Sequence, residues 1–260
     1  ESGLPRVAVI GTGGTISSVG RHTRDLLDYA VNKRIYDVHE LLAQVPETGE
    51  VAEIVPIAFK AIPSTAMGPT QWLELAALVH QTVANDTALC GIVITHGTAS
   101  LEETAYFLNL VLKVSIPVVV VGAQRPASGI STDANANLLN AVRVAGSADS
   151  IGLGVLVVLN DEIHAAREVT KTSTLKLQTF RSPDFGCLGH ADADRVAYYR
   201  HPIRRRMPTT EFDVSGLTDL PRVDIVMSYA GADGAAIRGC VAAGARGIVS
   251  AGFAPGLSTQ

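Results

Sequence analysis

A short glycine turn at the end of an apolar run is the feature that most constrains the fold of this chain. Residues 6–10 read RVAVI and lead directly into GTGGTI at 11–16. An apolar, β-branched run that ends in glycines predicts a buried strand with a tight loop at its carboxyl end. Open α/β sheets bind ligands at that end of their strands, so Thr12, whose hydroxyl lies between glycines, is a candidate nucleophile.

The same turn argues against a nucleotide site. A dinucleotide-binding turn needs a third glycine where this chain has Ile16, and an acid about 20 residues further on at the end of a second strand. Asp28 is near that distance, but the run around it is not strand-like, and no lysine follows the glycines as in a P-loop. A purely structural turn remains the alternative for this motif taken by itself.

A second apolar strand also leads into a glycine–threonine pair. The run 91–95 is followed by His96, Gly97 and Thr98, and Ser100 with Glu103 predicts a capping box that starts a helix. We therefore expect Thr98 to lie beside the free N–H groups of a helix N-terminus, a suitable place for a carboxylate or a developing oxyanion.

A third segment offers a base. Residues 167–172 follow the predicted strand 152–159 and contain Lys171 in a mostly uncharged stretch. An amine in such surroundings loses its charge more readily when it is desolvated. Thr12, Thr98 and Lys171, each at the end of a different strand, would form a nucleophile and its base.

Apolar strands alternate with helical stretches along the chain. This pattern predicts an α/β fold with a mainly parallel sheet flanked by helices. The predicted strands are 6–10, 91–95, 117–122, 153–159, 223–229 and 247–251. The composition predicts an N-terminal α/β catalytic domain at 1–201, a linker at 202–222 and the start of a smaller C-terminal α/β domain at 223–260.

Several long motifs, in this order, resemble the bacterial-type L-asparaginases and glutaminase-asparaginases, from about Arg6 to Gly252. They are GTGGTI at 11–16, VITHGT at 93–98, LEETAYFL at 101–108, PVVVVGAQRP at 117–126, NLLNAV at 137–142, GVLVVLNDEI at 154–163, REVTKTST at 167–174 and GIVSAG at 247–252. The resemblance implies an asparaginase-like fold and a hydrolase that acts on carbon–nitrogen bonds. Members of this family have a longer second domain, so the C-terminal domain is expected to be truncated or not fully represented.

The resemblance also implies roles for individual residues. Thr12 corresponds to the nucleophile, Tyr29 to a lid tyrosine that helps to activate it, and Thr98 with Lys171 to a proton-transfer pair. Ser64 corresponds to the serine that holds the substrate α-carboxylate. The implied reaction is a double displacement through an acyl-threonine ester.

The substrate-binding positions depart from the family pattern. Ala99 stands where the family has an aspartate for the α-ammonium group, and Thr65 and Ala66 replace a glutamine and often an acid. With Ser64, Gly97, Thr65 and Ala99 as substrate-binding residues, we expect a small amide, imide, lactam or ester without an α-amino group. The alternatives are a true L-asparaginase or glutaminase, naturally divergent or mutated at Ala99, and a catalytically silent binder of small acids.

Composition and charge exclude several other classes. The chain has 260 residues, 47% of them hydrophobic, and a formal net charge of -4, which offers no basic footprint for nucleic acid. The run Arg204–Arg206 is interpreted as a solvated linker or a subunit contact. No stretch approaches the length of a membrane span, so we expect a soluble protein, either cytoplasmic or exported. No cofactor is expected, and the resemblance implies a homotetramer built as a dimer of dimers.

Other polar residues receive structural interpretations. The cysteines, Cys90, Cys187 and Cys240, lack metal-ligand spacing and are expected to be buried free thiols, so no metal site is predicted. His96 is expected to bond to neighbouring main chain, and Glu102 to favour a helix N-terminus. Asp133 resembles a family aspartate that supports the active site from behind.

Overall fold

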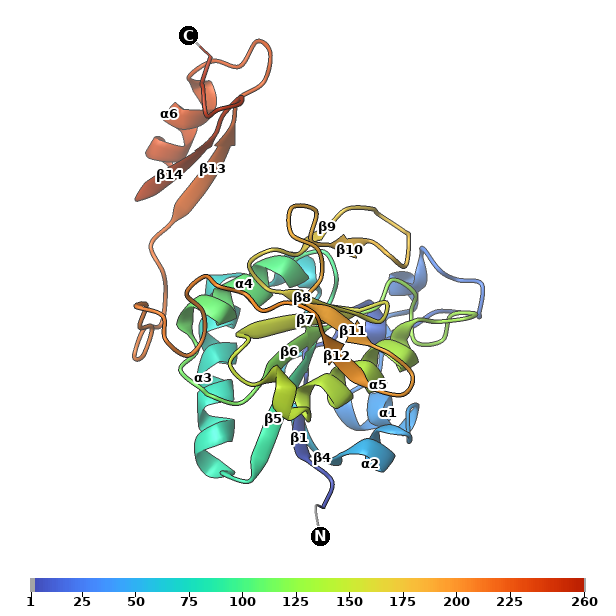
Figure 1. Ribbon diagram of the computed structural model, residues 1–260. Helices are drawn as coiled ribbons and strands as arrows, with labels where there is room; N and C mark the ends of the chain where they lie inside the picture. Colours follow the sequence, from blue (N-terminus) through green and yellow to red (C-terminus); the bar gives the residue numbers. More distant parts are fainter. Residues whose placement is uncertain (1–2, 260) are drawn as a thin grey trace. The chain divides into compact units, whose positions relative to one another are not determined.

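The computed structural model describes residues 3–259, which fall into two compact units divided between Ser215 and Gly216. In the first unit, one eight-stranded sheet has the order β12-β11-β8-β7-β6-β5-β1-β4 and carries helices on both faces (Figure 1). Its strands are β1 (Arg6–Gly11), β4 (Glu53–Ala58), β5 (Leu89–Thr95), β6 (Val118–Val121), β7 (Val155–Leu159), β8 (Glu162–Ala165), β11 (Gly189–Ala191) and β12 (Val196–Tyr198).

The central strands β4, β1, β5, β6 and β7 are all parallel. The sequence predicts four of these strands, but not β4, whose segment EIVPIA contains a proline. Both faces of β1 are buried, because Val7 and Val9 belong to one core cluster and Ala8 and Ile10 to the other. Such two-sided burial explains why this strand is a continuous apolar run. The fold class predicted from the sequence is therefore confirmed.

Amphipathic helices cover the two faces of the sheet. Their apolar side chains join the two core clusters, which lie on opposite sides of the strands. Side chains of α1 (Val38–Ala43) and α5 (Ala134–Ala145) join one cluster, and those of α3 (Pro69–Asn85) and α4 (Leu101–Val111) join the other. The short helix α2 (Thr48–Val51) lies between α1 and β4 in the chain.

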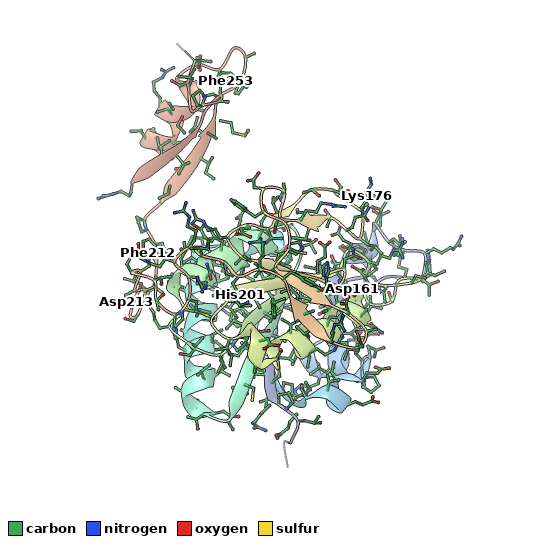
Figure 2. All side chains as sticks on the ribbon, viewed as in Figure 1. Asp161, Lys176, His201, Phe212, Asp213 and Phe253 are labelled. Atoms are coloured by element: carbon green, nitrogen blue, oxygen red, sulfur yellow. The ribbon has the colours of Figure 1, made fainter. Side chains whose placement is uncertain are left out.

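The sheet changes direction after β7. Asn160 and Asp161 both have positive φ, 51° and 63°, and form the tight turn of a β7–β8 hairpin, with Asp161 labelled in Figure 2. Short polar side chains tolerate this left-handed conformation better than others do. Strands β8, β11 and β12 then pair antiparallel at this end of the sheet, which the sequence did not predict.

The remaining elements of the first unit are short. Two small antiparallel ribbons pair β2 (Ser18–Val19) with β3 (Arg34–Ile35), and β9 (Thr170–Lys171) with β10 (Phe180–Arg181). The 3-10 turns are η1 (Thr15–Ser17), η2 (Tyr29–Asn32), η3 (Ser64–Ala66) and η4 (Ala148–Ser150). The β9–β10 ribbon and the turns η2 and η3 carry four of the predicted site residues, namely Lys171, Tyr29, Ser64 and Thr65.

The second unit is a βαβ arrangement. Strands β13 (Val223–Met227) and β14 (Gly247–Ala251) are parallel and are connected through α6 (Ala235–Ala242). Both strands lie within the ranges that the sequence predicts. Among residues 3–259, no helix combines the length and the apolar character needed to cross a membrane.

The cysteines are free thiols, as expected, but the expectation that they are buried is wrong. Cys90 is exposed, and Cys187 and Cys240 are only half-buried. Cys90 stands at the start of β5, outside both core clusters. Cys90 is exposed although its neighbours Leu89 and Gly91 are buried, because successive side chains of a strand point to opposite faces of the sheet.

Candidate active site

The glycine turn after β1 places Thr12 in a structural position. Thr12 is fully buried, and its hydroxyl donates to the main-chain carbonyl of Thr95, 2.6 Å away. Its N–H bonds the same carbonyl at 3.3 Å, and its own carbonyl accepts from Ile62 N–H. A hydroxyl enclosed and engaged in this way is not placed to attack a substrate. The sequence-based assignment of Thr12 as nucleophile is therefore corrected.

Thr15, three residues further on, has the geometry that was expected of Thr12. It opens η1, is half-buried, and its Oγ1 lies 2.6 Å from Oη of Tyr29. The predicted lid tyrosine is thus paired with a threonine of the turn, but with Thr15. Sequence reasoning missed this residue, although it follows the pair Gly13-Gly14 and so carries the same glycine signal.

Gly14 brings this turn against the loop after β5. It has a φ of 90°, and a Cβ atom added to it would lie 2.4 Å from the main-chain nitrogen of Gly97. No side chain fits in that space, and L-residues rarely adopt this conformation. The contact places the main chain before Thr15 directly against the loop that carries Thr98.

Thr98 and Lys171 form the pair that the sequence predicts. Nζ of Lys171 donates to Oγ1 of Thr98 at 2.8 Å. Lys171 was expected to follow a parallel strand, but the antiparallel strand β8 lies between β7 and Lys171 in the chain. The segment that contains Lys171 is held beside α4, where Glu102 accepts hydrogen bonds from Thr170 Oγ1 and from the main-chain N–H of Lys171. Glu102, in the first turn of α4, thus holds the candidate base Lys171 in place.

Two opposing effects act on the pKa of Lys171. Burial lowers the pKa of this lysine, while the Glu102 carboxylate acts in the opposite direction and raises it. An amine with a lowered pKa is a better proton acceptor near neutral pH than an exposed lysine. The hydrogen bond then directs that basicity to the hydroxyl of Thr98.

The predicted capping box at the start of α4 does not form. The helix does begin after Ser100, but the Ser100 hydroxyl donates to the carbonyl of Ser64, 2.6 Å away, and makes no cap. Ser64 Oγ in turn accepts from the N–H of Ala99 at 3.2 Å. The Ser100 hydroxyl thus bonds to Ser64, which is distant in the sequence, rather than to the first turn of its own helix. These bonds bring Ser64, Gly97 and Ala99 together, whereas Thr65, the next residue of η3, is exposed.

An open pocket of about 470 Å³ adjoins the Thr98–Lys171 pair. It is lined by Ala99, Glu102, Lys171 and residues 172–174, and Ala99 itself is exposed. The lining is mainly polar: Glu102 comes from the first turn of α4, and the other polar residues come from β9 and the segment that follows it.

Two supporting residues are placed as expected. His96 is fully buried, with Nδ1 2.7 Å from the carbonyl of Gly97 and Nε2 2.8 Å from Thr104 Oγ1, and burial lowers its pKa to about 4. The Asp133 carboxylate accepts from the N–H groups of Gln124 and Arg125, each at 2.9 Å. Asp133 thereby fixes the loop after β6.

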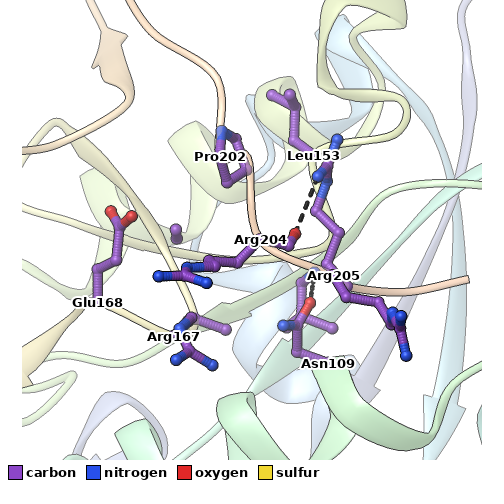
Figure 3. A pocket seen from close by; sticks show the side chains of 11 residues that line it. Asn109, Leu153, Arg167, Glu168, Pro202, Arg204 and Arg205 are labelled. Atoms are coloured by element: carbon purple, nitrogen blue, oxygen red, sulfur yellow. Dashed lines mark hydrogen bonds between the residues drawn. The ribbon is translucent and has the colours of Figure 1, made fainter. Parts of the chain in front are cut away.

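The basic run lies in a different part of the first unit. Arg204, Arg205 and Arg206 line a small pocket with Asn109 and Arg167 (Figure 3). Arg206 donates to the carbonyl of Arg204 at 3.1 Å, and Asn109 Oδ1 accepts from a main-chain N–H at 3.0 Å. This pocket contains none of the predicted catalytic or substrate-binding residues.

One cysteine lies beside two other side chains of metal-binding types. Glu162, Cys187 and His190 offer ligand atoms that all lie within 4.8 Å of one another. Spacing in the sequence concealed the cluster, because it forms across paired strands. It shares no residue with the Thr15–Tyr29 or Thr98–Lys171 pairs.

Comparisons with known proteins agree on one family. The sequence profile "Asparaginase, N-terminal" matches residues 6–204. "L-asparaginase 2" of Escherichia coli is 42% identical over 253 residues, covering 97% of this chain and 71% of the relative. For "L-asparaginase 2" of Bacillus subtilis the identity is 40%, with coverages of 97% and 66%. The solved structure "Probable Cytoplasmic L-asparaginase from Campylobacter jejuni" superimposes with a TM-score of 0.92 at 39% identity, covering 98% of this chain and 76% of that one.

Gly14→Ala tests the close approach of the two loops. The added Cβ meets the main chain of Gly97, so we expect a loss of more than about 2 kcal/mol in the free energy of unfolding, measured with urea. Gly152→Ala is the matched control, since Gly152 has a φ of 78° but no neighbouring atom within 4 Å. Equal losses in the two variants would show that backbone strain alone, rather than loop contact, requires glycine at position 14.

Proposed function

The chain belongs to the asparaginase family, and from this premise we propose that it hydrolyses the amide of a small carboxylate-bearing substrate by acyl transfer through Thr15. That the chain is an asparaginase-type amidohydrolase follows from the comparisons. The observation that supports the threonine mechanism is the presence of two hydroxyls on contacting loops. Thr15 is paired with Tyr29, and Thr98 with Lys171.

The proposed reaction has two steps. In the first step, Thr15 Oγ1 bonds to the amide carbonyl carbon, its proton passes by way of the Tyr29 hydroxyl to the amide nitrogen, and the carbon–nitrogen bond breaks so that ammonia leaves. In the second step, water attacks the carbonyl carbon of the acyl-threonine ester and gives a proton through Thr98 to Lys171. The ester carbon–oxygen bond then breaks, the acid product leaves, and that proton is returned to Thr15 Oγ1. Main-chain N–H groups of the glycine turns stabilise the oxyanion in both steps.

L-asparagine is the first candidate substrate. The relatives named above are L-asparaginases, and the exposure of Ala99 leaves the site of the missing aspartate open to water. An α-ammonium there keeps much of its hydration, so the absence of the aspartate removes one favourable contact without burying a charge. L-asparagine is therefore a more favourable substrate than the sequence alone predicts.

The second candidate is an amide without an α-amino group. Ala99, Thr65 and Ala66 all lack the carboxylate or amide side chain that the family pattern has at these positions. A substrate such as succinamate, which is asparagine without its amino group, needs none of those partners. The homotetramer implied by the resemblance stays a prediction.

Thr15→Ala tests the proposed nucleophile. Because a methyl group cannot form the acyl ester, we expect kcat for ammonia release to fall at least about 1,000-fold. Thr12→Val is the matched control: it loses a buried hydrogen bond, which lowers stability by about 1–3 kcal/mol, but should keep activity within about tenfold. Retained activity in Thr15→Ala, together with loss in a folded Thr12→Val, would return the role to Thr12.

Glu102→Gln tests Lys171 as the base. Activity should rise with pH as the lysine loses its proton. Since the Glu102 carboxylate raises the pKa of Lys171, its removal lowers that pKa and shifts the rising limb of the kcat/KM profile to lower pH. Glu103→Gln, on the exposed neighbour, should leave the limb unchanged. A limb that does not move in Glu102→Gln would exclude Lys171 as the titrating group.

Ala99→Asp tests the substrate. A restored carboxylate adds one charged hydrogen bond to an α-ammonium, typically about 1.5–3 kcal/mol, so kcat/KM for L-asparagine should rise roughly 10- to 150-fold. Turnover of succinamate should not improve. In the unmodified chain, the ratio of kcat/KM for the two substrates decides between the candidates. No ammonia release from either would support the silent binder.

A further inference from the structure

A cluster of metal-binding side chain types lies at the antiparallel end of the sheet. Strand β8 carries Glu162 and His164, and β11 carries His190, which pairs in register with Glu162. Directly paired residues, and residues two apart in a strand, share one face of a sheet. Pairing of β8 with β11 therefore brings Glu162, His164 and His190 to one face of the sheet. Cys187 lies three residues before His190, and its sulfur joins the same cluster.

The distances within this cluster suit a tetrahedral ion. Sγ of Cys187 lies 3.7 Å from Nε2 of His190, and the ligand atoms of Glu162, Cys187 and His190 all lie within 4.8 Å of one another. Zinc bonds of about 2.3 Å to sulfur and about 2.05 Å to nitrogen set two tetrahedral ligands about 3.6 Å apart. The cysteine and the histidine are thus already at the spacing that zinc requires.

His164 supplies an independent observation. It is 1% exposed, and its Nδ1 lies 2.9 Å from Ser182 Oγ. Its other nitrogen, Nε2, has no hydrogen-bond partner among residues 3–259 and lies 3.1 Å from the Glu162 carboxylate. Buried polar atoms are nearly always satisfied. A buried nitrogen that makes no hydrogen bond and lies beside the Glu162 carboxylate therefore indicates that a further ligand is bound at this cluster.

The charges around the cluster are compatible with a divalent cation. Glu162 and a Cys187 thiolate would supply two negative charges. Arg200 also adjoins the cluster, with its Nε donating to the carbonyl of Cys187, but its guanidinium is paired with Glu168. Thiolate with imidazole and a carboxylate favours zinc over magnesium or calcium, which prefer oxygen ligands alone.

We propose that Glu162, Cys187 and His190 bind a zinc ion, with His164 adjoining them from the buried side. The ion would connect β8 to the segment that leads into β11. Its role would be structural, because the cluster shares no residue with the proposed catalytic pairs. Bound zinc would therefore hold the antiparallel edge of the sheet against unfolding.

Cobalt and zinc titrations of the full chain test this site. The unmodified chain should bind one equivalent of Co²⁺ with a sulfur-to-cobalt charge-transfer band, which one equivalent of Zn²⁺ abolishes. Saturating Zn²⁺ should raise Tm by about 5 °C. Cys187→Ser should lose the charge-transfer band and the stabilisation by Zn²⁺. Cys90→Ser, which changes an exposed cysteine outside the cluster, should keep both.

His190→Gln supplies a second variant, which keeps the thiol. Its zinc affinity should fall by more than the roughly 10- to 100-fold typical for loss of an outer-shell partner. Absence of a band and of stabilisation in the unmodified chain would overturn the proposal and leave Glu162 and His164 as an ion pair. Binding that survives in both Cys187→Ser and His190→Gln would overturn it too, by placing the metal elsewhere.

Discussion

The parallel pairing of β1 with β5 is the constraint on which the candidate active site depends, because it brings the carboxyl ends of the two strands side by side. The buried Thr12 hydroxyl extends this pairing by one bond, to the carbonyl of Thr95. Beyond it, the main chain at Gly14 lies against Gly97, and the two loops present Thr15 and Thr98 from one edge of the sheet. The register of two buried strands thus determines where the candidate reactive groups lie.

The second constraint is the return of the chain after the β7–β8 hairpin. An antiparallel strand ends at the edge of the sheet away from the catalytic loops, so Lys171 could not reach Thr98 from the end of β8. The Glu102 carboxylate, at the start of α4, holds the returning segment by Thr170 and by the main chain of Lys171. One acidic residue therefore both positions the base and sets the balance between its charged and neutral forms.

Sequence alone predicted four of the five central strands, because β1, β5, β6 and β7 are continuous apolar, β-branched runs, and the glycine turns marked the edge where the candidate site lies. It missed β4 and β12, and also β8 and β11, whose short segments EIHA and GHA have no clear apolar pattern. It also proposed Thr12 as the nucleophile, a residue whose hydroxyl the structure buries. Thr12 and Thr15 both follow glycines, and what distinguishes them is a carbonyl 83 residues away from Thr12. Likewise, Ser100 lost its predicted cap to Ser64, 36 residues distant. Local patterns carry no information on such partners.

Ala99 shows how exposure changes the meaning of a substitution. In a closed apolar site, loss of a carboxylate would leave an α-ammonium buried and unpaired, which is strongly unfavourable. In the structure, Ala99 is exposed and lines a polar pocket with Glu102 and Lys171. Water can then solvate the ammonium, and the substitution costs only the difference between one hydrogen bond to aspartate and one to water. In the proposed reaction, the identity of residue 99 thus adjusts the preference between related amides, while the hydroxyl pairs at Thr15 and Thr98 would provide the chemistry common to both.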